Sequence, residues 1–128
     1  MPDWMFDTVA LIDYYHNRPG VAPYFEMILS GQAIGAFSTI AELELWQGIR
    51  PGEEERHAAL LALLERVPLD SAIARRAGQL RQRVGLEQLS LPDAAIAASA
   101  QLTGRPLLTR NSRHFRAISD LLAVELYR

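Results

Sequence analysis

The chain has 128 residues, the size of one ordinary domain with its own hydrophobic core. Hydrophobic residues make up 49% and charged residues 22%, a composition typical of a globular fold rather than of a disordered chain. The absence of cysteine excludes a disulfide framework and a thiolate metal site, and the net charge of −2 argues against a general nucleic-acid binder.

The sequence also predicts where the protein is found. It has no run of about 18 apolar residues, the length that a membrane-spanning helix needs, and its start, "MPDWMFD", lacks the basic and apolar segments of a signal peptide. We therefore expect a cytoplasmic protein without a membrane segment. The charge is uneven, because residues 1–64 carry nine acids and three arginines, whereas residues 65–128 carry six acids and ten arginines. Every basic residue is arginine, for which codon bias is the favoured explanation; the alternative is that the planar guanidinium suits phosphate.

The first half of the chain predicts two strands that are each followed by helices. A short strand is expected to end at Asp7, and apolar residues at helical spacing follow it. A second helix is expected to stop at Gly31, and the strand 33–37 comes next. Ser38 is a good N-cap for the helix after that strand. A further helix is expected over residues 53–67, because three acids stand at its start.

The second half predicts two more helices and two more strands. Residues 68–85 have an apolar face and an arginine-rich face, as an amphipathic helix requires. Another helix is expected from about Leu91, followed by the strand 105–109, a turn or short helix over 112–118 and a last strand near 122–126. Strands that alternate with helices predict an α/β fold with a mostly parallel sheet, covered by helices on both faces.

This topology predicts a position for a functional site. In open α/β sheets, ligands bind beyond the carboxyl ends of the strands. Asp7 closes the first expected strand, and Asn111 lies just past a later one. Glu42 and Glu44 fall in the helix that follows the second strand, and Asp93 falls in the first turn of its helix. We therefore expect these polar side chains to meet at one edge of the sheet.

Each of these acids also has an ordinary structural explanation. Ser90 and Asp93 fit a capping box, which is the favoured explanation for Asp93 taken alone, and Asp7 could cap the helix after it. An unpaired buried carboxylate is costly, however, so Asp7 between two apolar runs needs a partner or a metal. Glu42 and Glu44 point to different sides of a helix, because they are two residues apart, so only one is expected to face the site.

Other chemistries have no motif in this sequence. There is no glycine-rich phosphate loop and no G-x-S-x-G nucleophile, and His16, His57 and His114 lack the spacing of a zinc site. The candidate chemistry is a carboxylate site for Mg²⁺ or Mn²⁺, which prefer oxygen ligands. Neighbouring carboxylates repel one another, so at least one of them is expected to have a raised pKa while no ion is bound.

Four short segments, in the order in which they occur, resemble the motifs of the PIN-domain family, and within it the VapC-type toxins of bacterial and archaeal toxin–antitoxin pairs. They are "FDTVALID" with Asp7, "STIAELELWQG" with Glu44, "PDAAIAASA" with Asp93 and "LLTRNSRHF" with Asn111. The Glu-Leu-x-x-Gly frame of the second motif selects Glu44 and leaves Glu42 outside it. The resemblance covers essentially the whole chain and implies one PIN-like domain, residues 1–128, with a three-layer arrangement.

The resemblance also implies an activity, that of an endoribonuclease that hydrolyses phosphodiesters with a water activated by Mg²⁺ or Mn²⁺. Asp7 and Asp93 would be the primary metal ligands, and Glu44 would hold a water or act as a base. Asn111 and Thr109 would position the water or the phosphate. The fourth motif departs from the family at positions 111 and 114, which are often acidic there and are Asn and His here. Three carboxylates therefore stand where the family often has four.

Three partners follow from the resemblance: an RNA substrate, an antitoxin encoded nearby that restrains the nuclease, and a second copy of the chain in a homodimer. Contacts to the RNA backbone are expected from Arg75, Arg76, Arg83, Arg110 and Arg113. A groove for the antitoxin or the second copy is expected among Tyr14, Tyr15, Phe25, Trp46, Leu60, Leu61, Leu63 and Leu64, although at least half of these leucines would simply be core.

Two alternative functions stay open. One is a PIN fold that has lost its activity and only binds a partner protein. The other is a different Mg²⁺-dependent phosphohydrolase, although the D-x-D-x-T motif of haloacid-dehalogenase-type phosphatases is absent after Asp7. Binding of Mn²⁺ would separate the inactive binding module from both enzymes, and a comparison of RNA with small phosphate esters would separate the two enzymes.

Overall fold

A five-stranded parallel sheet, in the order β3-β2-β1-β4-β5, forms the centre of the computed structural model, which describes residues 1–128. The middle strand pairs Phe6 with Phe37 on one side and with Leu108 on the other. The central strands are short apolar runs, as strands covered on both faces require. The strands are β1 (Asp3–Phe6), β2 (Ile34–Ser38), β3 (Glu65–Val67), β4 (Leu107–Thr109) and β5 (Val124–Leu126).

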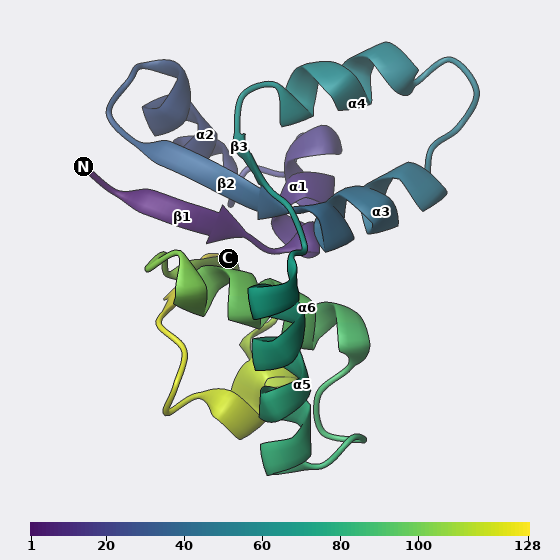
Figure 1. The fold of residues 1–128 in the computed structure, drawn as a ribbon. Coiled ribbons are helices and arrows are strands. Elements are labelled where there is room, and N and C mark those ends of the chain that lie inside the picture. The colour runs from purple at the N-terminus through teal and green to yellow at the C-terminus, as the bar shows by residue number, and fades with distance from the viewer.

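Two layers of helices enclose the sheet (Figure 1). The first four helices lie on one face, and α5, α6 and the 3₁₀ helix η1 lie on the other, as right-handed crossovers in this strand order require. No helix is long and apolar enough to cross a membrane. The helices are α1 (Thr8–Tyr15), α2 (Ala22–Leu29), α3 (Thr39–Gln47), α4 (Glu54–Leu61), α5 (Ser71–Val84), α6 (Leu91–Leu102) and η1 (Ser112–Ile118).

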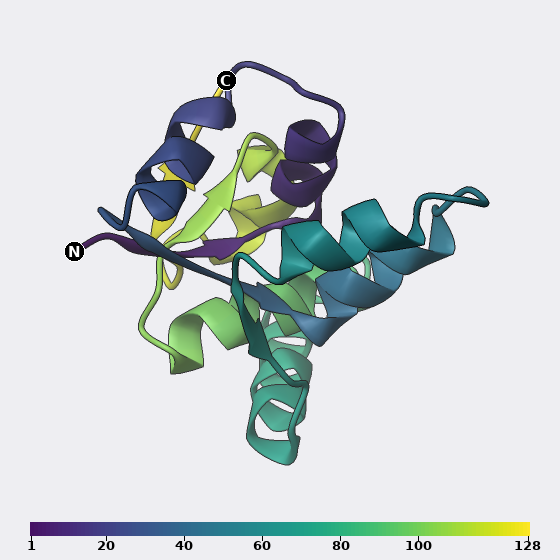
Figure 2. The ribbon, with the colours of Figure 1, turned by 90° about the horizontal axis from the view of Figure 1, so that it is seen from above.

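The core lies between the sheet and α6 on one side and between the sheet and α1 and α2 on the other. Seven consecutive residues of α6, from Ala94 to Ala100, are buried, and five of them are alanine. Their small side chains let the helix lie close to its neighbours. Helices α3 and α4 run side by side and extend beyond the strands, which the view from above shows best (Figure 2).

The predicted three-layer α/β fold is confirmed, and the sheet is wholly parallel. The N-cap assigned to Ser38 is also confirmed, since its hydroxyl accepts the Ile40 N–H at 3.1 Å. The single helix predicted over residues 53–67 is wrong, because α4 ends at Leu61 and β3 follows at Glu65–Val67. This strand has only three residues, too few for an alternating pattern, and pairing with β2 creates it. The first strand ends at Phe6, one residue earlier than predicted.

Candidate active site

Asp7 follows β1, at the point where the strand order of the sheet reverses. The chain runs from β1 to β2 on one side, whereas β4 pairs with β1 on the other side. Such switch points are where open α/β sheets bind ligands. The Asp7 side chain is the N-cap of α1 and accepts from Thr8 N at 2.8 Å. Its other oxygen accepts from the Thr109 hydroxyl, at the end of β4, at 2.7 Å. The two bonds fix the carboxylate between adjacent strands.

The Asp7 carboxylate is held in an unfavourable environment for a negative charge. Asp7 is only 4% exposed. Burial raises its pKa from 3.8 to about 6; the hydrogen bond from Thr109 lowers the pKa in part, whereas the nearby Asp93 and Glu44 carboxylates raise it. A divalent cation would relieve this repulsion. The helix-cap role and a metal-binding role are compatible, since the cap uses one oxygen and leaves a lone pair on the other.

Asp93 lies in the first turn of α6, where Ser90 supplies the cap. The Ser90 hydroxyl accepts the Asp93 N–H at 3.2 Å. The other half of the expected capping box, a bond from the Ser90 N–H to the Asp93 carboxylate, does not form. Burial raises the pKa of Asp93. One carboxylate oxygen lies 3.8 Å from His114 Nδ1, a partner that sequence reasoning had dismissed.

The two glutamates of α3 point to different partners, as expected. The Glu44 carboxylate accepts from the Thr8 hydroxyl at 2.7 Å, so it lies next to the residue that Asp7 caps. The Glu42 carboxylate accepts from Arg66 at 2.9 Å and from Trp46 Nε1 at 3.4 Å, away from the site. The structure thus brings Glu44, and not Glu42, to the neighbourhood of Asp7.

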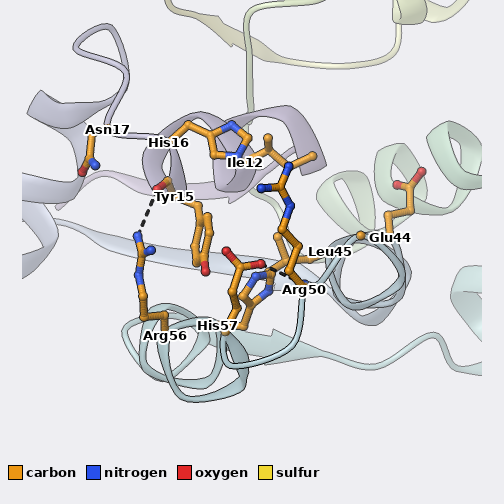
Figure 3. Close-up of a pocket in the computed structure, with 11 residues that line it drawn as sticks. Ile12, Tyr15, His16, Asn17, Glu44, Leu45, Arg50, Arg56 and His57 are labelled. Atoms are coloured by element: carbon orange, nitrogen blue, oxygen red, sulfur yellow. Dashed lines mark hydrogen bonds between the residues drawn. The ribbon is translucent and has the colours of Figure 1, made fainter.

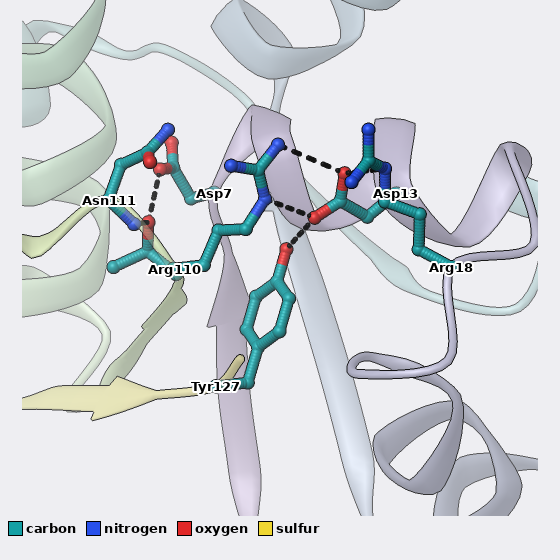
Figure 4. A network of polar contacts seen from close by, with 7 residues as sticks. Asp7, Asp13, Arg18, Arg110, Asn111 and Tyr127 are labelled. Carbon is teal, nitrogen blue, oxygen red and sulfur yellow. Dashed lines mark hydrogen bonds and ion pairs between the residues drawn. The ribbon is translucent and has the colours of Figure 1, made fainter.

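Asn111 follows β4 and faces Asp7 (Figure 4). The Asn111 N–H donates to the Thr109 hydroxyl at 3.0 Å, which in turn donates to Asp7. Thr109 is fully buried. This chain of bonds fixes the loop after β4 against Asp7 and leaves the Asn111 amide without a hydrogen bond to another residue.

A second buried acid, Asp13 of α1, organises the other side of the same loop (Figure 4). The Asp13 side chain is 2% exposed and forms ion pairs with Arg110 at 2.6 Å and Arg18 at 3.4 Å. The Tyr127 hydroxyl, next to the C-terminus, donates to it at 2.7 Å. Burial alone would raise the pKa of Asp13, but the bonds from Arg110 and Tyr127 outweigh it and hold the pKa below its usual value. The Arg110 side chain therefore anchors the loop after β4 to α1 through its ion pair with Asp13.

The other arginines predicted to contact RNA divide into engaged and free side chains. Arg76 donates to Gln101 at 2.9 Å, eight residues beyond Asp93 and about 12 Å away along α6. Arg83 forms an exposed ion pair with Asp120 at 2.9 Å. Arg75 and Arg113 are exposed and form no ion pair or hydrogen bond through their side chains. Arg113 lies in η1, two residues after Asn111.

A pocket of about 500 Å³ adjoins the site between α1, α3 and α4 (Figure 3). Glu44 lines this pocket, so the pocket is continuous with the group of carboxylates near Asp7. Arg50 and Arg56 line it too, and neither was singled out from the sequence. Buried beneath them is His57, whose Nδ1 has no hydrogen-bond partner. Isolated arginines in loops and exposed helix turns carry no sequence signal, which is why only the structure reveals this cluster.

The predicted metal ligands fit a divalent ion only in part. No three acidic or histidine side chains converge on one point, and Glu44 is directed to Thr8. Mg²⁺ does not require such a cage, because one or two carboxylates with several waters commonly hold it. Asp7 and Asp93 are consistent with that arrangement, since burial raises the pKa of both carboxyls and the neighbouring carboxylates raise that of Asp7 further.

The chain is similar to known proteins over nearly its whole length. A family model described as PIN domain matches residues 4–121. The chain belongs to the PIN-domain family. Within this family it is 31% identical, over 120 residues, to a protein named Ribonuclease VapC19 from Mycobacterium tuberculosis, covering 91% of this chain and 95% of the relative. It is 33% identical over 106 residues to Ribonuclease VapC10 from the same organism, covering 80% of each chain.

Solved structures of similar proteins agree with the fold. A toxin–antitoxin complex from Klebsiella pneumoniae has a chain with a TM-score of 0.78 and 31% identity, covering 96% of this chain and 98% of that one. VapBC2 from Rickettsia felis, bound to a DNA fragment, also has a TM-score of 0.78; at 22% identity it shows the fold alone, over 98% and 99% of the two chains. The PIN-like fold and the VapC resemblance predicted from the four motifs are therefore confirmed.

Proposed function

We propose that this PIN-domain protein is an endoribonuclease that depends on Mg²⁺ or Mn²⁺ and acts in the cytoplasm as the toxin of a type II toxin–antitoxin pair. The observation that carries the proposal is that the Asp93 and Glu44 carboxylates lie close enough to buried Asp7, at the switch point of the sheet, to raise its pKa. These residues come from three separate segments, and the fold alone brings them together. The names of the relatives support ribonuclease as the activity.

Each residue of the site has a role in this proposal. Asp7 and Asp93 hold the cation, which supplies activation of a water and stabilisation of charge on the phosphate. Glu44 orients the attacking water or accepts its proton, because its carboxylate lies near Asp7. The two acids are joined through Thr8, whose N–H donates to Asp7 and whose hydroxyl donates to Glu44. Thr109 fixes the Asp7 carboxylate, and Asn111 offers an amide to the water or the phosphate.

RNA would reach the carboxylates between η1 and the pocket of Figure 3. Arg113 on one side and Arg50 on the other present guanidinium groups, which suit phosphate oxygens. Arg56 already donates to the Tyr15 carbonyl at 3.3 Å. Arg110 and Arg76 are not part of this proposal, because Asp13 and Gln101 already engage them. RNA binding through a few arginines agrees with a net charge of only −2 over the whole chain.

Glu44→Gln is expected to reduce RNA cleavage by about 100-fold or more, since removal of a general base commonly has an effect of that size. The matched control is Glu42→Gln on the same helix, which removes the charge that pairs with the half-exposed Arg66, away from the site, and should leave the rate nearly unchanged. Initial rates on a labelled RNA at saturating Mn²⁺ measure both. Equal losses, or a larger loss at Glu42, would contradict the role given to Glu44.

The toxin–antitoxin relatives support an antitoxin as partner, because the Klebsiella pneumoniae structure is described as such a complex. An arginine of an antitoxin could bind the Asp7 and Asp93 carboxylates bidentately and exclude the cation. The groove predicted for this partner is only partly available. Phe25, Leu60 and Leu61 are buried core residues, and Tyr14 stacks on Phe25 at 3.7 Å.

A homodimer would use a different apolar face, formed where α3, α5 and α6 meet. Leu43, Leu86 and Leu91 are 58%, 64% and 68% exposed and line one groove there. We expect the purified chain to be a dimer by light scattering, and Leu43→Arg to convert it to a monomer because a charge cannot be buried unpaired. Leu29→Arg is the matched control, since Leu29 is 59% exposed on α2, on another face. A dimer that survives Leu43→Arg, or a monomeric parent, would contradict this interface.

The inactive binding module is the second candidate, and Asn111 in place of an acid favours it together with the incomplete ligand cage. Calorimetric titration with Mn²⁺ tests this alternative, because a module without a metal site should bind none. Parallel assays with RNA and p-nitrophenyl phosphate then separate a nuclease from a general phosphohydrolase. Cleavage of RNA alone, dependent on Mn²⁺, is the result that the proposed function predicts.

A further inference from the structure

Two polar atoms in the pocket of Figure 3 are buried and have no hydrogen-bond partner. One is Nδ1 of His57, a residue that is only 3% exposed. The other is the hydroxyl oxygen of Tyr15, whose ring centroid lies 4.4 Å from that of His57. Such atoms cost stability and are rare in folded proteins, so two of them beside one cavity are expected where a ligand completes their bonds.

The wall that carries these atoms is held in place by contacts within the protein. The His57 ring packs against Trp46, at a centroid distance of 5.4 Å, as well as against Tyr15. The Arg56 guanidinium lies 4.2 Å from the centroid of the Tyr15 ring and donates to the Tyr15 carbonyl at 3.3 Å. The two unpaired atoms therefore belong to rings whose positions are fixed before any ligand binds.

Arg50 adds a free positive charge to the same pocket. It lies in the loop between α3 and α4, and its side chain extends toward α1 (Figure 3). Its N–H donates to the Glu53 carboxylate at 2.8 Å, whereas its guanidinium forms no hydrogen bond and no ion pair. The guanidinium is therefore available to an anion.

The pocket adjoins the candidate active site. Glu44 lines it and accepts from the Thr8 hydroxyl, and the Thr8 N–H donates to Asp7. A ligand in the pocket can therefore be continuous with a chain that reaches Asp7. The volume of about 500 Å³ lies within the range of pockets for small ligands.

These features fit one unpaired nucleotide. The Arg50 guanidinium suits a phosphate, and an unstacked base is recognised by contact with aromatic rings and by hydrogen bonds at its edge. A neutral imidazole nitrogen offers one such bond, as donor or acceptor. An acidic side chain of a protein would also suit Arg50, but Glu53 lies near the Tyr15 hydroxyl and favours a neutral base there over a second carboxylate.

We propose that this pocket binds one unpaired nucleotide of the RNA, beside the phosphate that is cleaved. Arg50 holds the phosphate of this nucleotide, and its base enters beside the Tyr15 and His57 rings and bonds to their unpaired atoms. This inference rests on the proposed function and deepens it, since it makes His57 and Tyr15 determinants of base preference at one position next to the cut. The two atoms lower the stability of the free protein and gain their partners only when RNA binds.

Nucleotide binding to the metal-free chain tests the pocket without any cleavage. The four 5′-ribonucleoside monophosphates and inorganic phosphate are titrated separately into the whole chain in EDTA, and the backbone amide resonances are followed. At least one nucleotide should shift the resonances around Arg50 and His57 at a lower concentration than phosphate does. Arg50→Gln should weaken this binding at least about tenfold, as loss of a hydrogen bond to a charged group does. Arg66→Gln, whose parent side chain pairs with Glu42 away from the site, is the charge-matched control and should not.

A randomised single-stranded RNA pool, cleaved with Mn²⁺ and sequenced at the cut sites, tests the role of the two rings. His57→Phe should reduce the preference among bases at one position beside the cut by about fivefold or more, the worth of one hydrogen bond. Its melting temperature should equal or exceed that of the parent, because an apolar edge replaces an unpaired nitrogen. Tyr15→Phe, which removes the other unpaired atom, should act in the same direction and serves as the second variant if His57→Phe does not fold.

Three outcomes overturn the inference while the proposed function stands. They are pocket resonances that no nucleotide shifts, shifts that inorganic phosphate reproduces at the same concentration, and a base preference that both His57→Phe and Tyr15→Phe retain. Loss of antitoxin binding by His57→Phe with an unchanged base preference would instead assign the pocket to the protein partner. A parent that cleaves no RNA with Mn²⁺ fails the proposed function, and this inference with it, whatever the nucleotide titration shows.

Discussion

Asp7→Asn is expected to reduce Mn²⁺-dependent RNA cleavage by at least about 100-fold, because loss of residues that merely support metal ligands already costs 10–100-fold. The same substitution should raise the melting temperature of the metal-free protein. Burial holds the pKa of Asp7 at about 6, so at pH 7 the folded chain carries an unfavourable charge. Its removal should stabilise the fold by on the order of 2 kcal/mol.

The pH dependence of stability provides an independent readout of this residue. Between pH 3.8 and about 6 the folded chain binds the Asp7 proton more tightly than the unfolded chain does. Stability of the metal-free parent from this group should therefore decline as pH rises through that window, and Asp7→Asn should lack this decline. Asp3→Asn, at the other end of β1, is the control and should keep both the decline and the activity. Parental cleavage by Asp7→Asn would exclude Asp7 as a ligand.

Asp13→Ala is expected to be the most destabilising substitution, with a loss of about 3–5 kcal/mol, as is typical when one partner of a buried ion pair is removed. It leaves Arg110 and the Tyr127 hydroxyl without their acceptor. Chemical denaturation at pH 7 measures the loss. Asp120→Ala is the control, because its ion pair with Arg83 is exposed on both sides and should contribute less than about 1 kcal/mol.

The contribution of Asp13 should also depend on pH in the opposite sense to that of Asp7. The pKa of Asp13 is lower in the folded chain than in the unfolded chain. Its stabilising effect should be complete at neutral pH and be lost as pH falls through the folded-state pKa. Similar stabilities of the parent and Asp13→Ala at pH 7 would show that the network of Figure 4 contributes little.

Asp7 and Asp93, the acids of the candidate site, could be located from the sequence because one follows a strand and the other begins a helix, positions that topology brings to one edge. Glu44 required more, since only the Glu-Leu-x-x-Gly frame distinguished it from Glu42, and the Thr8 contact now gives the physical reason. Strand β3 could not be predicted, because its three residues lack a pattern and are extended only by pairing with β2.

Long-range polar contacts were the other feature that could not be predicted from the sequence. Asp13 interacts with Arg110 and Tyr127, which lie about a hundred residues away in the sequence, so no local pattern links them. Arg110 was one of five arginines predicted to contact RNA, and nothing in the sequence indicated its ion pair with Asp13. His114 lacked the spacing of a zinc site, and only the fold places it beside Asp93.

Cleavage of RNA by the purified chain, before and after removal of metal, tests the central claim most directly. The parent, freed of antitoxin, should cleave a labelled RNA with Mn²⁺, lose the activity in EDTA and regain it when Mn²⁺ is restored. Asp93→Asn, which keeps the Ser90 cap of α6, should remain folded and inactive throughout. Cleavage that persists in EDTA, or that Asp93→Asn retains at the parental rate, would contradict a metal-dependent site at Asp7 and Asp93.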